Sequence, residues 1–531
     1  MSLASHRLRW ALLALVLLVA AALRFVGLRF GFPALTHADE PQVVMVAVNA
    51  AMGQFSPGFF AYPALFPYTA GLVLLLWVLV QPWVWPDFQV FFDQYCTDPR
   101  AAYLVVRTCG AAAGLGVVAA TAWLGRKAAG PRVGLLAAAV MAVNVYAVRD
   151  SHFAVTDTPA TLAATLTLVA ILALFEGRSL GRVLLAGAAL GLAAGTKYPV
   201  GVLALPLAAT IAWQAWRSPG AAGPRVAGAI RDLALAAGVA LVAFLLTNPY
   251  LLLDFGTFQA DMALEAERRL AVSADQFEGP AWRWYLVNTL PTAFGWAGLI
   301  LTATGMAWAL VAREKRLMIL VLSAVVLLAP AFMVVSVGER YLLPASPPLA
   351  VLAAWAAIQL TRRCLPQGRW VANTVLAALV AALLLPPMAR SLRLVQLFTL
   401  PDTRVLASAW IAETLAPGRS IALEWSYVPQ VDPDTYQVVP LRYELGAPLA
   451  QDADYIVVSS YAFNRYFMEP QAHQQELAFF ATLDAGPPPI AIFTGLPPER
   501  AYGYVERVPP GPLDQVGMVG PEIRIYGPYP R

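Results

Sequence analysis

The chain has 531 residues, of which 59% are hydrophobic and only 13% are charged, a composition typical of integral membrane proteins. The formal net charge of +4 is small and comes mostly from arginines in short loops, so the absence of a basic stripe excludes a nucleic-acid partner. The three cysteines, Cys96, Cys109 and Cys364, have no metal-like spacing, and their positions argue against a disulfide framework.

The first apolar segment, residues 10–27, follows Arg7 and Arg9 as a signal peptide would. It lacks a small-residue cleavage site and many apolar segments follow, so we predict a retained first membrane helix. The next apolar run, 62–81, contains two prolines and is followed by the Trp-rich stretch QPWVWPDF. These features favour an interfacial segment on the outer leaflet, within a large first outer loop, although an ordinary crossing is the alternative.

Later apolar runs are long enough to cross a bilayer and alternate with two kinds of loop. One kind is rich in arginine, as in GRKAAGPR (125–132) and TRRCLPQGR (361–369), and the other is poor in Lys and Arg. The positive-inside rule places the first kind in the cytoplasm and the second outside. The sequence therefore predicts a multi-pass, mainly α-helical bundle of about 11 spans in the cell membrane, over residues 1–395. The predicted crossings after the first are 101–125, 132–149, 154–175, 180–197, 199–216, 227–248, 287–312, 316–337, 341–360 and 370–389.

Residues 400–531 have a different pattern. TRVLASAWIAETL has helical periodicity, while RSIALEW, DYIVVSS, PIAIFTG and IRIYG are short strand-like runs separated by Pro and Gly. Helices that alternate with apolar strands predict a small α/β domain. The predicted topology places this domain outside the cytoplasm.

Ionisable side chains near the membrane are candidate functional residues, because charges at that depth are costly. The predicted topology brings the candidates in the loops to the same, outer side. These candidates are His37, Asp39 and Glu40, then Arg149, Asp150, His152 and Asp157, then Lys197, and finally Glu339, Arg340 and Tyr341. Arg107 lies inside a predicted span and needs a partner, either an acid of the first outer loop or a phosphate.

These residue types suit one kind of reaction. A carboxylate pair at the mouth of a bundle can accept a proton from an attacking alcohol. The cations Lys197 and Arg340 suit a phosphate, the ammonium as a point charge and the guanidinium as a two-pronged donor. A phosphate held in a lipid-facing groove implies a lipid phosphate. Together they favour group transfer from a polyprenyl phosphate, itself a membrane lipid, to a hydroxyl acceptor.

Four segments carry a family resemblance. THADEPQVV, RDSHFAVTDTP, GLAAGTKYPVGVL and ERYLLPASPPLAVLAA, in this order, resemble the membrane glycosyltransferases of the protein O-mannosyltransferase and aminoarabinose-transferase superfamily. The resemblance implies a GT-C fold, a polyprenyl-phosphate sugar donor, inversion at the anomeric carbon and a catalytic base at Asp39, with Glu40 beside it. Arg340, Lys197, Arg107 and Tyr341 are then expected at the donor phosphate. The class of acceptor (protein, lipid or glycan) stays open.

Several candidates have a second interpretation. Asp39 and Glu40 precede a proline and suit the acidic start of a helix. Lys197 also fits a lysine that snorkels from a helix end. His152 and Asp157, with His37, are candidate ligands of a divalent metal ion or contacts of the acceptor, whereas Asp157 also suits a helix cap. No cofactor is expected beyond such an ion.

Two other classes of protein compete with the enzyme. A transporter or flippase of a lipid-linked sugar would use the same charges to guide an anionic head group. It would show matching broken helices in two halves, with polar groups near the middle of the bilayer, and no such repeat is evident in the sequence. A non-catalytic assembly partner would need no acid pair.

Overall fold

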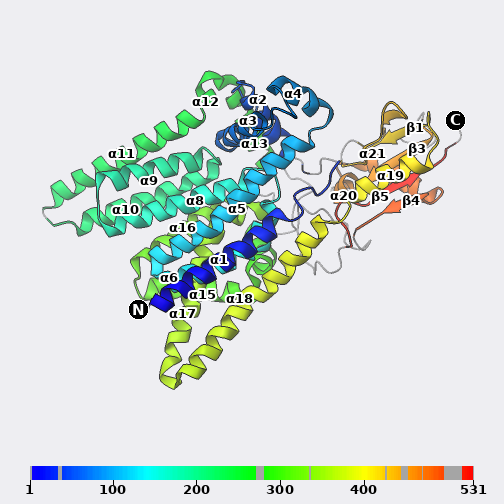
Figure 1. Ribbon diagram of the computed structural model, residues 1–531. Helices are drawn as coiled ribbons and strands as arrows, with labels where there is room; N and C mark the ends of the chain where they lie inside the picture. The colour runs from blue at the N-terminus through cyan, green and yellow to red at the C-terminus, as the bar shows by residue number, and fades with distance from the viewer. Residues whose placement is uncertain are drawn as a thin grey trace. The chain divides into compact units, whose positions relative to one another are not determined.

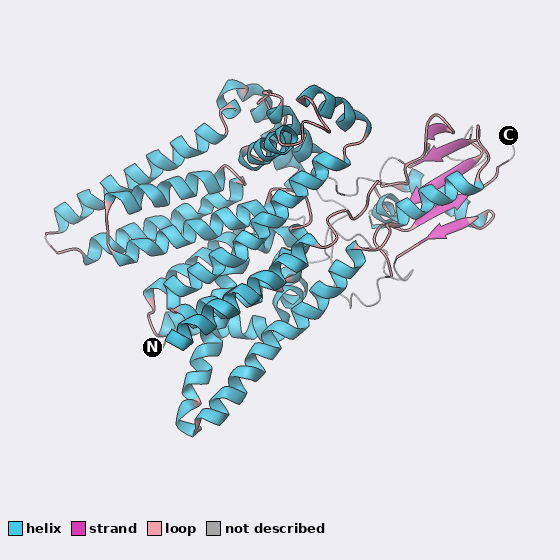
Figure 2. Cartoon of the chain, in the orientation of Figure 1, coloured by secondary structure: helices cyan, strands magenta, loops and turns pink. Residues whose placement is uncertain are grey.

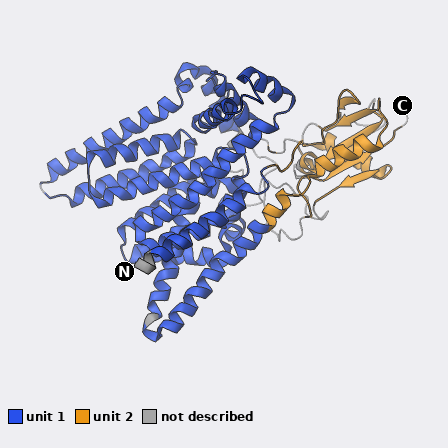
Figure 3. Ribbon diagram, viewed as in Figure 1, with its two compact units in different colours: residues 1–28, 39–271, 277–392 blue, residues 29–38, 272–276, 393–531 orange. Residues whose placement is uncertain are grey.

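The computed structural model describes residues 3–33, 37, 39–219, 221–270, 280–333, 337–424, 427–443, 453–468, 470–495 and 517–529. The chain separates into two units, coloured in Figure 3. The first unit contains residues 1–28, 39–271 and 277–392, and the second consists mainly of residues 393–531, with residues 29–33 from the start of the chain.

The first unit is a helical bundle. Among the described residues, nine helices are long and apolar enough to cross a membrane. They are α1 (Leu3–Phe25), α5 (Arg100–Ala129), α8 (Asp157–Ala173) with η1 (Leu174–Glu176), η2 (Tyr198–Leu203) with α10 (Ala204–Arg217), α11 (Ala222–Thr247), α14 (Ala281–Trp284) with η3 (Tyr285–Thr289) and α15 (Leu290–Val311), α16 (Lys315–Met333), η4 (Glu339–Ala345) with α17 (Ser346–Arg363), and α18 (Arg369–Phe398). Shorter apolar helices are α3 (Leu65–Leu79), α6 (Pro131–Ala142) and α9 (Leu180–Ala194).

Nine of the eleven predicted crossings correspond to these long helices, and two are shorter than predicted. The segment 132–149 is divided because Asn144 caps a new helix, α7 (Val145–Asp150), by accepting a hydrogen bond from the backbone N–H of Ala147 at 3.0 Å. The segment 180–197 ends early because Lys197 is extended, with φ −158°, immediately before the 3-10 turn η2. Both interruptions bring loop residues toward the candidate site.

Small residues allow close helix packing in the bundle. Gly187 and Gly191 lie one turn apart on α9 and face the backbone of Ala236 and Ala240 on α11. A Cβ atom at either glycine would overlap a backbone carbonyl oxygen of α11, so only glycine permits this approach.

The remaining short helices gather at one end of the bundle, where Figure 1 shows α2, α3, α4, α12 and α13 together. Their bounds are α2 (Glu40–Ala51), α4 (Phe88–Thr97), α12 (Tyr250–Leu253) and α13 (Phe255–Leu270), and a further turn, η5 (Leu365–Gln367), lies elsewhere. The Asp261 carboxylate of α13 accepts a hydrogen bond from the backbone N–H of Phe60 at 2.7 Å, and the Asn248 side chain accepts one from Ala64 at 2.6 Å. These bonds fix the segment between α2 and α3.

The second unit contains a five-stranded mixed sheet, drawn in magenta in Figure 2. The strands are β1 (Ser420–Leu423), β2 (Gln437–Pro440), β3 (Tyr455–Ser459), β4 (Ala491–Phe493) and β5 (Ile523–Tyr526), in the order β2-β1-β3-β5-β4. β1 is parallel to β2 and β3, whereas β5 is antiparallel to β3 and β4. The four predicted strands are confirmed, and β2 is the strand that the sequence analysis missed.

Helices cover both faces of this sheet. Ile421 and Val457 pack with Ile411 of α19 (Thr403–Thr414) on one face. Ala422 and Ile456 point to the opposite face, against α20 (Ser460–Met468) and α21 (Gln474–Ala485). Because successive strand residues alternate between faces, the central strands β1, β3 and β5 are buried on both sides of the sheet.

Candidate active site

The carboxylates of Asp39 and Glu40 lie where α2 begins. Asp39 occupies the N-cap position and makes no capping hydrogen bond with its side chain, and Glu40 is the first helical residue. Although Asp39 and Glu40 stand at an acidic helix start, as one interpretation of the sequence expected, their side chains have separate partners. These partners define two different roles.

Glu40 forms a buried ion pair. Its two carboxylate oxygens accept hydrogen bonds from Nε and Nη2 of Arg107, both at 2.7 Å, and both side chains are 0% exposed. Glu40 Oε1 also accepts a bond from the backbone N–H of Ala154 at 2.8 Å, and Arg107 Nη1 donates to the carbonyl of Leu28 at 2.9 Å. The pair therefore ties α2, α5 and the loop before α8 together.

This geometry bears on two expectations from the sequence. Arg107 has the first of its two expected partners, an acid of the loop before α2, and both side chains are fully buried. A charge in this position needs its partner, because an unpaired buried charge is strongly unfavourable. The roles of Glu40 in catalysis and of Arg107 at the donor phosphate stay predictions, and the pairing favours a structural role for both side chains.

Asp39, by contrast, is reachable from outside the bundle. Its Oδ2 atom accepts hydrogen bonds from the Tyr62 hydroxyl at 3.0 Å and from Nη1 of Arg340. The side chains of Asp39 and Arg340 are 22% and 29% exposed, so a substrate can reach both groups. Burial raises the pKa of the Tyr62 hydroxyl well above its usual range. The Arg340 cation lowers this pKa and the Asp39 carboxylate raises it further. Tyr62 therefore stays protonated and donates a hydrogen bond to Asp39.

Another ion pair lies close to the pair formed by Asp39 and Arg340. Lys197, at the start of η2, pairs with the Asp157 carboxylate at the start of α8. The Lys197 ammonium and the Arg340 guanidinium each lie 5.8 Å from the centre of the Tyr341 ring. The predicted phosphate-binding residues Lys197, Arg340 and Tyr341 are thus brought together, close to Asp39.

Buried polar contacts hold the turn that carries Arg340. Arg149 donates to both oxygens of Asp150, at 2.9 and 3.1 Å, and reaches Glu339 at 3.4 Å, with Arg149 only 2% exposed. The Tyr285 hydroxyl accepts from the backbone N–H of Gly338 at 3.1 Å. The start of η4, and with it Arg340, is therefore fixed from two directions.

The structure does not assemble the candidate metal ligands. Both ring nitrogens of His152 lie against backbone carbonyls, those of Val148 at 2.8 Å and Val26 at 2.9 Å, so neither nitrogen faces the cluster. Asp157 is engaged by Lys197, and His37 is a buried residue of the second unit. Across the residues described above, no three His, Cys, Asp or Glu side chains are arranged to hold a metal ion.

The sequence analysis missed Tyr62 and Tyr285, and it assigned no role to Arg149, Asp150 or Glu339. The tyrosines carry no charge at neutral pH, so a search for ionisable groups in outer loops passes over them. The three charged residues were visible, but the contact between Arg149 and Glu339 joins side chains that are 190 residues apart in the sequence.

Comparisons with known proteins show what the sequence and the fold of this chain resemble. Residues 60–255 match the family described as dolichyl-phosphate-mannose-protein mannosyltransferase. No curated protein matches the chain. Among solved structures, the chain is similar to ArnT from Cupriavidus metallidurans in the apo state, with 15% identity, a TM-score of 0.51 and coverage of 99% of this chain and 98% of that one. It is also similar to the oligosaccharyltransferase AglB from Archaeoglobus fulgidus in complex with an inhibitory peptide and a dolichol-phosphate, with 11% identity, a TM-score of 0.54 and coverage of 90% and 72%.

The helical bundle and its likeness to these structures show a multi-pass membrane protein with the GT-C fold. Within that fold, residues 60–255 are similar to the dolichyl-phosphate-mannose-protein mannosyltransferases, which are glycosyltransferases that use a lipid-phosphate sugar. The predicted fold class, family and enzyme class are confirmed. The family match includes Lys197 and Asp157 but ends before Arg340 and begins after Asp39.

Proposed function

We propose that the protein transfers a sugar from a polyprenyl phosphate to a hydroxyl acceptor, with inversion, at the outer face of the cell membrane. The observation that carries the proposal is the Asp39 carboxylate, which is partly exposed and pairs with the partly exposed Arg340. An acid and a phosphate-binding cation at one accessible point are the two groups that this transfer needs.

The reaction balances with these residues. The acceptor hydroxyl oxygen attacks the anomeric carbon, and its proton passes to the Asp39 carboxylate as the new carbon–oxygen bond forms. The bond between the anomeric carbon and the phosphate oxygen breaks, and its electron pair leaves on the phosphate. Arg340 and Lys197 stabilise the charge that develops on that phosphate, which departs as the polyprenyl phosphate.

The ion pairs suggest how the donor prepares the base. In this structure, Arg340 pairs with Asp39 and Lys197 pairs with Asp157. A phosphate that attracts both cations competes with the two carboxylates for them. Withdrawal of Arg340 makes the Asp39 carboxylate a stronger proton acceptor, because a nearby cation stabilises the ionised acid. Donor binding and base activation are then linked through one side chain.

A nearby apolar groove suits the prenyl chain. A cavity of about 530 Å³ is formed by side chains of α3, α5, α8 and α9. Pro159 lines it two residues after Asp157, and Leu65 lines it while its backbone N–H bonds to the Gly195 carbonyl, two residues before Lys197. The groove therefore begins beside the ion pair of Lys197 and Asp157, so a phosphate there can extend its apolar chain into it. The dolichol-phosphate in the AglB complex supports a polyprenyl lipid as the donor carrier.

The distribution of arginines supports the outer face. The connections that follow α5, η1, α10, α15 and α17 are rich in arginine. Lys197 and Arg340 precede α10 and α17 at the opposite ends of those helices, and Asp39 pairs with Arg340. The positive-inside rule places the arginine-rich ends in the cytoplasm. The candidate site then faces the exterior.

The test is transfer by purified protein. Polyprenyl-phosphate sugars and candidate hydroxyl acceptors are incubated with the wild type and with Asp39→Asn, and the products are identified by mass spectrometry. Asp39→Asn should lose about a hundredfold to ten-thousandfold in rate and still bind the donor, as expected for loss of a general base. Asp98→Asn is the matched control, because Asp98 also pairs with an arginine, Arg100, at 2.6 Å in an exposed position.

Two outcomes contradict the proposal. Near-normal transfer by Asp39→Asn would remove Asp39 as the base. Movement of the lipid-linked sugar across vesicle membranes without any change in its chemistry would favour a flippase instead.

A further inference from the structure

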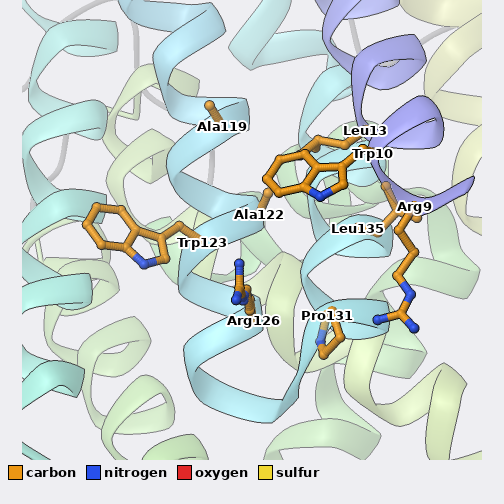
Figure 4. A pocket seen from close by; sticks show the side chains of 9 residues that line it. All are labelled: Arg9, Trp10, Leu13, Ala119, Ala122, Trp123, Arg126, Pro131 and Leu135. Atoms are coloured by element: carbon orange, nitrogen blue, oxygen red, sulfur yellow. The ribbon is translucent and has the colours of Figure 1, made fainter. Parts of the chain in front are cut away.

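A second groove opens at the other end of the bundle, between α1 and the corner where α5 meets α6. Its volume is about 520 Å³, and Figure 4 shows the side chains around it. The lining residues are Arg9, Trp10, Leu13, Ala119, Ala122, Trp123, Arg126, Pro131 and Leu135. Arg126 lies 19 residues after Arg107 on α5, a rise of about 28 Å, which is close to the thickness of the hydrocarbon core. This groove and the candidate active site therefore lie at opposite faces of the membrane.

The lining changes in chemistry along the helix axes. Arg9 and Arg126 lie at the rim, Trp10 and Trp123 stand on either side at the next level, and Leu13 and Ala119 lie deepest (Figure 4). The rise from Arg126 to Ala119 is about 10 Å. A basic rim, then an indole level, then an apolar floor is the order of surfaces that a phospholipid presents from head group to acyl chain.

The shape of the groove leaves room for the acyl chain of a lipid. Ala119 and Ala122 leave a hollow on α5, and the flanking indoles of Trp10 and Trp123 are 55% and 50% exposed. The two tryptophans therefore form walls that face lipid and do not fill the hollow. Indole rings prefer the interfacial level of a bilayer, where the glycerol and ester groups of a lipid lie.

The charge at the rim is positive. Arg9 and Arg126 both line the groove, and its lining contains no Asp or Glu among the described residues. Two guanidinium groups at one rim attract a phosphate, which they can contact in a two-pronged manner.

We propose that this groove binds an anionic glycerophospholipid of the cytoplasmic leaflet. The phosphate lies between Arg9 and Arg126, the glycerol region lies between the two indoles, and an acyl chain follows Leu13 and Ala119. This site is separate from the donor site and does not depend on the proposed function.

Native mass spectrometry of the purified full-length protein tests this site. The protein is incubated with phosphatidylglycerol or with phosphatidylcholine of the same acyl chains, and the retained lipid is counted. The wild type should retain phosphatidylglycerol preferentially. Loss of one arginine should weaken that retention about fivefold, and Arg9→Gln with Arg126→Gln should abolish the preference.

Two further variants separate charge, shape and folding. Ala122→Phe keeps both arginines but fills the hollow, so it should also lose the retained lipid. Arg225→Gln is the control, because Arg225 lies 5.9 Å from the Trp216 ring among the arginine-rich loops and does not line the groove. Arg225→Gln should retain phosphatidylglycerol as the wild type does.

Equal retention of the two lipids by the wild type would overturn the proposal, because the groove would then hold any membrane lipid. Unchanged retention in the double variant or in Ala122→Phe would place the bound lipid elsewhere. A second copy of the protein in the groove would appear as a dimer that phosphatidylglycerol does not displace, which would also overturn the proposal.

Discussion

Asp39 and Glu40 are neighbours in the chain, yet their carboxylates reach different partners in different environments. Asp39 contacts Arg340 and is 22% exposed, whereas Glu40 is paired with Arg107 and is 0% exposed. The start of α2 between them turns one side chain toward the accessible cluster and the other into the bundle. An acid pair that looks uniform in sequence thus divides into a partly exposed carboxylate, which we propose as the base, and a fully buried carboxylate in an ion pair.

The Glu40–Arg107 pair should govern stability more than chemistry. Glu40→Gln leaves Arg107 charged and unpaired in a dry interior, so we expect a loss of roughly 3–5 kcal/mol in unfolding free energy. The double variant Glu40→Gln with Arg107→Met should recover most of that loss, because no charge remains buried and the amide oxygen of the substituted side chain can still accept from the N–H of Ala154. Thermal unfolding in detergent measures both. If the double variant were as unstable as Glu40→Gln, the unpaired charge would not be the cause.

Arg340→Lys should impair transfer although it keeps the positive charge. The ammonium lacks the planar fork that can contact Asp39 in the free enzyme and a phosphate in the donor complex. Loss of a charge-assisted hydrogen bond is worth about 1.5–3 kcal/mol, or roughly ten- to a hundredfold in kcat/KM for the donor. Steady-state kinetics with a polyprenyl-phosphate sugar measures this value. Arg100→Lys, in the exposed pair with Asp98, serves as the control and should leave kcat/KM unchanged.

The length of the prenyl chain should matter at the apolar groove beside Asp157. Ala163→Phe adds a ring to the lining of that groove, so it should raise KM for long-chain donors and have little effect on short-chain analogues. Ala119→Phe introduces the same ring on α5 in the other groove and should leave the donor KM unchanged. The measurement is the KM of each variant for a long-chain donor and for a short-chain donor. Equal effects of Ala163→Phe on both lengths would indicate a general disturbance of the bundle.

Much of the fold follows from local patterns in the sequence. Apolar length and loop arginines identify the nine long helices of the described residues, and short apolar runs between Pro and Gly identify four of the five strands. Strand β2 was not predicted because its QVVP segment is short and ends in proline. It also lies at the edge of the sheet, with mostly exposed side chains. The break at Asn144 is a capping event inside an apolar run, which a hydropathy window averages away.

The site was harder to predict than the fold. The candidates Asp39, Lys197, Arg340 and Tyr341 do come together, because each lies at the same end of a helix in the bundle. The different partners of Asp39 and Glu40 could not be predicted from the sequence, because they depend on which face of α2 contacts Arg107. The surroundings of His152, a candidate metal ligand, could not be predicted from the sequence either. Its two ring nitrogens lie against backbone carbonyls, and these contacts depend on the fold.

Glu424 gives the α/β domain a specific dependence on pH. This side chain is 2% exposed, and burial raises its pKa from 4.5 to about 7, while hydrogen bonds from the Ser459 N–H and the Tyr443 hydroxyl, each at 2.7 Å, act in the opposite direction. Because the folded domain holds the proton more tightly than the unfolded chain, its contribution to stability is complete below about pH 4.5. That contribution is lost as the pH rises to about 7. The shift of the Glu424 pKa corresponds to about 3 kcal/mol of unfolding free energy.

Replacement of Glu424 by glutamine tests this dependence. The glutamine amide can accept from the Ser459 N–H and donate to the Tyr443 oxygen without carrying an ionisable group, so Glu424→Gln should be as stable as the wild type at pH 4.5 and more stable above pH 7. Melting temperatures from pH 4.5 to 8, read from the protease resistance of the peptides that contain β1 and β3, measure the difference. Glu413→Gln, on the exposed face of α19, is the control for a change in net charge and should follow the wild-type curve. If Glu424→Gln kept the wild-type slope across this range, the proton on Glu424 would have no part in the stability of the sheet.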